Sequence, residues 1–190
     1  VDVSAVESMS SMIGDTLMDF ALNSTLETCH GNRHPDMAPH GVYPCADNEW
    51  ICIAVKDDSV WRLLAGRIMP SGLVNDDRFR TTASRKHHED ELNQIISDWT
   101  RGHDAQALAM ELQTLGVAAT KSLSSVDLVA DCHLWARDFY REVVGSDGTT
   151  QPIVGPGWKM SRGANITTGA PRLGEHNAYI LGDILGLSAD

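Results

Sequence analysis

The sequence has few positive charges and no long apolar run. These two absences argue against nucleic-acid binding and against a membrane-spanning helix. Its 190 residues include 15 Lys and Arg against 26 Asp and Glu, a formal net charge of -11. Phosphate binding needs a basic surface, so this balance argues against nucleic acid as a partner. No apolar run approaches the roughly 20 residues of a membrane helix, and the N-terminus lacks a basic region followed by an apolar one. We expect a soluble, cytoplasmic protein with no membrane partner.

Cysteine is also scarce, and its spacing argues against a disulfide framework. The chain has four cysteines and no CxxC pair, so we expect reduced thiols. Cys29 and His30, with His34 and His40 nearby, offer thiolate and imidazole ligands that suit zinc. No second Cys or His pair follows at finger-like spacing, so a polar connecting loop is the better interpretation and we expect no metal site.

What is present is an ordinary globular composition, 42% apolar and 22% charged, that begins with a helical pattern. Ser4 and Glu7 have the spacing of a capping box, so a helix should start there. Apolar residues follow at helical spacing and predict a broad buried stripe: Val6, Met9, Ile13, Leu17 and Phe20, with Met12, Leu22 and Leu26 beside them. This arm needs another surface to lie against.

The middle of the chain alternates turns, strands and helices. Glycine and proline predict a loop over 29–40, and strand formers at 42–45 and 50–55 around a polar turn predict a β-hairpin. Helices are expected from Asp57-Asp58 to Pro70, over 82–99 and over 104–114. We interpret the charged run around His87-His88 as a solvated helix face without function. Further expectations are a strand at 117–123, a helix at 126–136, turn-joined strands within 139–161 that include 158–160, and a helix over 177–187.

Several ordered segments resemble one enzyme family. The run from Gly31 to Val55, GNRHPDMAPHGVYPCADNEWICIAV, is similar to a segment of the class III CoA-transferases, also called CaiB/BaiF. Residues 75–79 (NDDRF), 115–119 (LGVAA) and 124–137 (SSVDLVADCHLWAR) resemble further family segments, and 170–177 (APRLGEHN) is the most specific of them. The resemblance covers nearly the whole chain.

The resemblance implies a fold and a division of the chain. It implies an α/β fold, the α+β-like small domain of the family, at 29–168. A helical arm at 1–28 and a C-terminal segment at 169–190 would pack on a Rossmann-like large domain. The chain would thus be the C-terminal portion of such a protein, with the catalytic N-terminal half absent.

The resemblance also implies chemistry. Family members move CoA from one carboxylate to another through anhydride and thioester intermediates on an aspartate, which suits a carboxylate nucleophile. That aspartate corresponds to no residue here, so no catalytic residue is assigned, and the chain alone should be inactive. The substrates would be an acyl-CoA thioester and a carboxylic acid, with no permanently bound cofactor. The partner would be a second copy in an interlocked homodimer, or a polypeptide that supplies the other half. A 2-methylacyl-CoA racemase and a non-catalytic assembly or binding subunit are the alternatives.

The part of a site that this chain would contribute is the loop 31–41. It corresponds in position to a glycine-rich loop that closes over the active site in formyl-CoA transferase, although it has two prolines in place of most of the glycines. Its substrate-loop candidates are Gly31, Asn32, Arg33, His40 and Gly41. Arg33 could pair with a substrate carboxylate or could order the loop against a partner domain. His40 could donate to a substrate oxygen or could be a structural hydrogen-bond partner.

Overall fold

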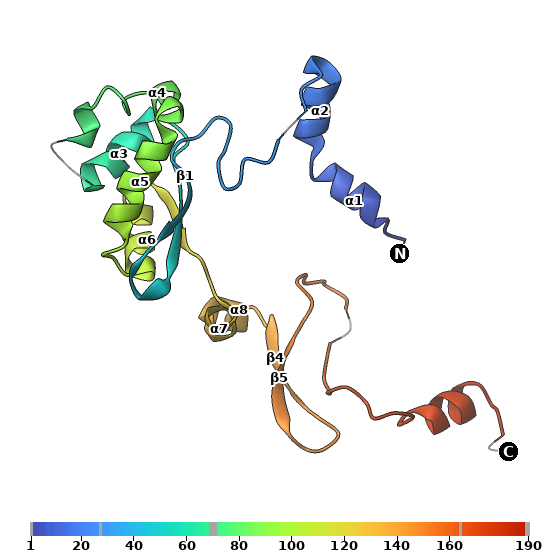
Figure 1. The fold of residues 1–190 in the computed structure, drawn as a ribbon. Helices are drawn as coiled ribbons and strands as arrows, with labels where there is room; N and C mark the ends of the chain where they lie inside the picture. Colours follow the sequence, from blue (N-terminus) through green and yellow to red (C-terminus); the bar gives the residue numbers. More distant parts are fainter. Residues whose placement is uncertain (1, 27, 69–71, 164, 189–190) are drawn as a thin grey trace. The chain divides into compact units, whose positions relative to one another are not determined.

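The structure is a computed structural model that describes residues 2–26, 28–68, 72–163 and 165–188. The chain divides into two compact units, Val1–Ser122 and Leu123–Asp190. The predicted small domain of 29–168 spans parts of both units, and its boundaries stay a prediction. Both units mix helices and strands (Figure 1), which confirms the predicted α/β class.

The first unit begins with the arm. Ser4 caps the first helix, because its hydroxyl accepts from the amide of Glu7 at 3.4 Å, as predicted. The apolar pattern then runs through two helices, α1 (Ala5–Ser11) and α2 (Gly14–Asn23). The break between them follows from weak helix formers, the serines of α1 and the glycine that opens α2. The prediction of a buried stripe is wrong for this chain, because no described residue of the arm is buried.

A three-stranded antiparallel sheet forms the centre of the first unit. The strands β1 (His40–Pro44) and β2 (Trp50–Ala54) make the predicted hairpin, and β3 (Ala118–Lys121) pairs with the other edge of β2. The hairpin turn contains a short 3-10 segment, η1 (Ala46–Asn48), in which Asp47 and Asn48 have φ of 54° and 60°. Asp and Asn tolerate this left-handed conformation better than most residues, which explains the tight reversal.

Helices cover one face of this sheet and form the core with it (Figure 1). Val60 and Trp61, Leu92 and Ile96, and Leu108 and Leu112 come from three different helices and pack against the strands. In the described residues, no helix is long and apolar enough to cross a membrane. The elements are α3 (Asp58–Ile68), η2 (Leu73–Asn75), α4 (Thr82–His87), α5 (Glu89–Thr100) and α6 (Ala105–Thr114).

Two predictions about the charged segment are corrected. The expected helix 82–99 is two helices, because His88, with φ -106° and ψ 29°, leaves the helical conformation between α4 and α5. Its charged run is not a wholly solvated face either, since Arg85 is 0% exposed and Glu89 is 5% exposed. Both side chains find charged partners inside the fold, which makes their burial possible. The predicted stop of α3 at Pro70 lies outside the described residues.

The second unit has short elements and little core. The expected helix 126–136 is split into α7 (Ser125–Ala130) and α8 (Cys132–Ala136), because Asp131 is extended there and caps α8 through its carboxylate. A hairpin of β4 (Tyr140–Val144) and β5 (Thr150–Val154) follows. Residues 158–160 form no strand, contrary to prediction, and the tail helix is a π-helix, η3 (Ala178–Ile184).

Candidate functional site

Among the described residues of the first unit, one face of the three-stranded sheet carries no helix and is lined mainly by small side chains. Along β2, Ile51 and Ile53 are buried in the core, so the alternation of a strand directs Cys52 and Ala54 to the opposite face. The strand register aligns them with residues of both neighbours. Val42, Cys52 and Thr120 form one row across the sheet, and His40, Ala54 and Ala118 form the next.

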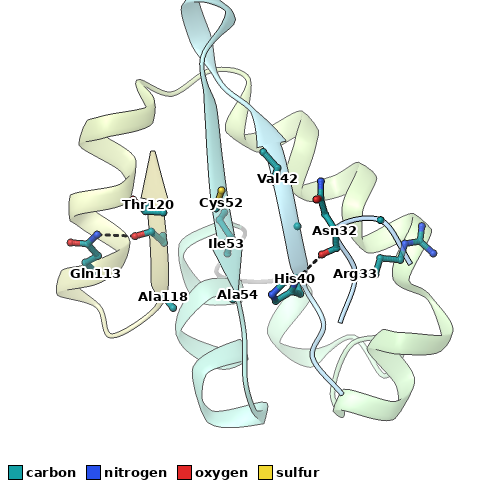
Figure 2. Close-up of a pocket in the computed structure, with 13 residues that line it drawn as sticks. Asn32, Arg33, His40, Val42, Cys52, Ile53, Ala54, Gln113, Ala118 and Thr120 are labelled. Carbon is teal, nitrogen blue, oxygen red and sulfur yellow. Dashed lines mark hydrogen bonds between the residues drawn. The ribbon is translucent and has the colours of Figure 1, made fainter. Parts of the chain in front are cut away.

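This open face is the floor of a groove of about 630 Å³ (Figure 2). The loop residues Gly31, Asn32 and Arg33 border it beside β1. Gln113 of α6 borders it beside β3, where its side-chain amide donates to the Ala119 carbonyl at 2.7 Å. No Asp or Glu is among the described lining residues, so in this part of the chain the groove offers apolar contact and neutral hydrogen-bonding groups rather than a carboxylate nucleophile.

The structure brings the five predicted loop residues together at one edge of the groove. Gly31, Asn32, Arg33, His40 and Gly41 all line it. Gly31 has φ of 64°, a left-handed conformation that favours glycine. The juxtaposition was predictable from the sequence because all five lie in a single loop and strand start. Their part in substrate binding stays a prediction.

Arg33 is held by acidic residues of α5. Its guanidinium forms an ion pair with Asp90 and lies 3.9 Å from a carboxylate oxygen of Glu89. Figure 2 shows its side chain directed away from the strands. The hydrogen bond to Asp90 raises the pKa of Arg33, so the guanidinium is firmly charged. Of the two roles considered for this arginine, the geometry favours ordering of the loop, and its partners lie within the same unit.

His40 ties the end of the loop to its beginning. Its Nδ1 lies 2.6 Å from the carbonyl oxygen of Asn32. A carbonyl only accepts, so Nδ1 carries the proton, and the Nε2 of the neutral ring is an acceptor. His40 therefore has the structural hydrogen bond considered for it. A donation to a substrate oxygen requires the protonated ring.

Gly41 is needed for close packing. A Cβ at this position would lie 3.0 Å from the Tyr43 hydroxyl oxygen and 3.1 Å from its ring carbon. The Tyr43 hydroxyl donates to the side-chain oxygen of Asn93 at 2.7 Å, and burial raises the pKa of this tyrosine. The edge of the groove is therefore fixed to α5 through a neutral phenol.

Sequence reasoning missed the floor of the groove. The alternation at 50–54 was a signal for Cys52 and Ala54, but no local pattern shows which residues of β3 stand beside them. All four cysteines are free, and Cys52 is half-buried. Among the described residues, no group of three or more His, Cys, Asp or Glu has the arrangement of a metal site.

The chain matches the family model described as CoA-transferase family III over residues 1–177. The chain belongs to CoA-transferase family III. It is 30% identical over 196 residues to the succinyl-CoA–D-citramalate CoA-transferase of Chloroflexus aurantiacus, a match that covers 100% of this chain and 48% of the relative. It is 28% identical to the succinate–glutarate CoA-transferase of Agrobacterium fabrum, covering 97% of this chain and 46% of that protein.

Solved structures of this family show the same fold. A CaiB/BaiF family protein from Brucella suis superposes with a TM-score of 0.80 at 23% identity, covering 94% of this chain and 46% of that chain. The chain thus spans about half the length of the two CoA-transferases named above. The resemblance to the CaiB/BaiF proteins is therefore confirmed for the family and for the fold.

Proposed function

We propose that the chain is the C-terminal part of an acyl-CoA:carboxylate CoA-transferase. The family match along residues 1–177 carries this proposal. In this proposal the nucleophilic aspartate lies outside this chain, because the resemblance to the family aligns it with no residue here. The substrates are an acyl-CoA thioester and a free carboxylic acid, and the thioester is a substrate rather than a bound cofactor.

The reaction proceeds by acyl exchange at that aspartate. Its carboxylate attacks the thioester carbon, which releases the CoA thiolate and leaves a mixed anhydride. The thiolate then attacks the aspartyl carbonyl, which frees the first carboxylic acid and leaves an aspartyl thioester. The acceptor carboxylate attacks the carbonyl carbon of this thioester, which releases the CoA thiolate and again leaves a mixed anhydride. The thiolate then attacks the acyl carbon of the acceptor, which forms the new acyl-CoA and frees the aspartate carboxylate.

This chain contributes walls and water exclusion to the reaction. Small side chains on the sheet face, such as Ala54, Ala118 and Val42, let an acyl group approach the backbone closely. The loop at 31–33 borders the same groove and screens the anhydride from hydrolysis. Asn32 and Gln113 border the groove, and their side-chain amide N–H groups would donate to an acyl oxygen.

The test begins with the coding DNA upstream of Val1, followed by expression of any longer reading frame found there. With an acyl-CoA donor and a carboxylate acceptor, the longer protein is expected to form the acceptor's CoA thioester, whereas the 190-residue chain alone is expected to form none. Exchange of an α-proton with deuterated water in the absence of an acceptor would instead identify a racemase. Turnover by the isolated chain would contradict the proposal.

A further inference from the structure

The loop beside the groove is held to the α4–α5 segment by four charged side chains, Arg33, Lys86, Glu89 and Asp90. The Lys86 ammonium donates to the His34 carbonyl oxygen at 2.8 Å and to a Glu89 carboxylate oxygen at 2.8 Å. From the other side, Arg33 of the loop lies 3.9 Å from the same Glu89 oxygen and pairs with Asp90. Glu89 thus interacts with two cations, Lys86, which donates to the loop, and Arg33, which belongs to the loop.

Within the described part of the chain, one oxygen of the buried Glu89 carboxylate lacks a hydrogen-bond partner, although the other accepts from Lys86. Its side chain is only 6% exposed, and its Oε1 has no hydrogen-bond partner among the described residues. An unpaired buried carboxylate oxygen costs free energy, and such local costs are typical of positions that serve a site. Its neighbour Asp90 is 86% exposed and carries no such cost.

We propose that Glu89 is a positioning residue that sets the loop at the edge of the groove through Lys86 and Arg33. It draws the Lys86 ammonium to the point where this group also donates to His34. It also attracts the guanidinium of Arg33, a residue that lines the groove. One buried negative charge therefore helps to set the loop at Arg33 and His34, beside the exposed ion pair of Arg33 with Asp90. A role of Glu89 in catalysis rests on the proposed function. Its role in the position of the loop is independent of that function.

The test is amide hydrogen exchange of residues 30–34 in the 190-residue chain, without substrate. Glu89→Gln keeps the size of the side chain and removes its charge. We expect exchange in the loop to become about tenfold faster, the ratio that corresponds to 1.4 kcal/mol. Asp77→Asn is the matched control, because Asp77 pairs with Arg80 at 2.9 Å where both side chains are well exposed. This control should leave exchange in the loop unchanged.

A double variant distinguishes an effect of Glu89 on the loop through Arg33 and Lys86 from a general effect of Glu89 on the stability of the fold. In a chain that carries Arg33→Ala and Lys86→Ala, the addition of Glu89→Gln should change loop exchange less than about twofold, because the groups through which it acts are gone. The same tenfold effect in that background would overturn the proposal, as would unchanged exchange in the single variant.

If the Glu89→Gln variant does not fold, hydrogen exchange of the Lys86→Ala variant tests the proposal instead. Loop exchange must rise in this variant while the amides of β1 and β2 stay protected, and unchanged loop exchange would overturn the proposal. Because no substrate is used, the result is independent of the transferase assay. A failure of the proposed role of Glu89 is therefore distinguishable from a failure of the proposed transferase function.

Discussion

Arg85 is a fully buried cation that joins three segments of the first unit. Its Nε donates to the Ala38 carbonyl oxygen at 2.6 Å, and its Nη1 donates to that of Phe79 at 3.1 Å. Asp58, at the start of α3, supplies the counter-charge at 2.9 Å. The guanidinium also lies 5.3 Å from the centre of the Trp61 ring. One side chain therefore holds the end of the loop, the start of α3 and the segment before α4 together.

We expect Arg85→Met to lower the free energy of unfolding by about 3 kcal/mol or more, since it leaves two buried carbonyls without a donor and Asp58 without its ion-pair partner. Urea denaturation followed by circular dichroism measures this change. Arg80→Met is the control, because its ion pair with Asp77 is exposed and such pairs contribute less than about 1 kcal/mol. Equal effects of the two substitutions would contradict the structural account of Arg85.

A second residue-scale prediction concerns the glycine in β1. Gly41→Ala would press on the Tyr43 ring and displace its hydroxyl from Asn93, so we expect a loss of about 1–3 kcal/mol in the free energy of unfolding. Gly66→Ala, in α3, meets nothing within 4 Å and should instead raise it by about 0.5–1 kcal/mol. Urea midpoints of the two variants, measured against the parent chain, should therefore move in opposite directions.

At the scale of elements, the start of α3 has a carboxylate cap. The hydroxyl of Ser59 and the amide of Val60 both donate to Asp57, at 2.5 Å and 3.0 Å. These hydrogen bonds lower the pKa of Asp57, with that of the Ser59 hydroxyl as the largest cause. A carboxyl whose folded pKa is below the unfolded value of about 3.9 stabilises the fold above that pH. The contribution is lost as the pH falls through the lowered folded pKa.

Asp57→Asn keeps a good N-cap and removes the charge, so the variant should lose less stability than the parent on acidification from about pH 5 to pH 2. Thermal midpoints at a series of pH values measure this. Other carboxyls with lowered pKa, such as Asp76 and Asp147, also destabilise the fold on acidification. The substitution is therefore expected to reduce the pH dependence of the thermal midpoint only in part. Parallel curves for the two chains would show that Asp57 does not contribute to the acid sensitivity.

The elements themselves were largely predictable, because their signals are local. Strand formers around a polar turn predicted the hairpin, and Asp57 marked a helix start that the structure confirms. The breaks at His88 and Asp131 were missed. Each interrupts an otherwise continuous helical pattern through its own backbone conformation, and neither is a glycine or a proline that would signal a break.

The site was predictable only where it is contiguous in sequence. Gly31 to Gly41 form one segment, so their proximity needed no knowledge of the fold. Arg85 and Glu89 were assigned to a solvated face because their partners at Ala38 and Arg33 are about fifty residues away in sequence. Burial of a charge depends on such distant partners, and helical periodicity does not reveal them.

At the scale of the whole molecule, the arm carries a large apolar surface. Met12, Leu17, Phe20 and Leu22 are each at least half exposed, and stripes of this size are typical of interaction sites. We propose a homodimer, or a complex with a polypeptide that supplies the other half, as the state in which this stripe is covered.

The prediction is tested by sedimentation of the chain at micromolar concentration, where we expect self-association, or association with the other half when that half is supplied. Leu17→Asp with Phe20→Asp should abolish it, because charges in a buried apolar stripe are costly. Gln106→Asp with Ala107→Asp adds the same charge to an exposed helix surface and should leave association intact. A parent chain that remains monomeric in both conditions would contradict the proposed assembly.

The free thiol in the floor of the groove makes occupancy of this face observable. Cys45 is buried, and Cys29 and Cys132 are exposed and replaceable by serine, which would leave Cys52 as the single accessible label site. A small alkylating reagent should modify Cys52 slowly in this chain, since the residue is half-buried. If the acyl group of an acyl-CoA donor occupies this groove, the alkylation rate should fall as donor is added. Mass spectrometry of a single peptide would thus report occupancy without a coupled assay.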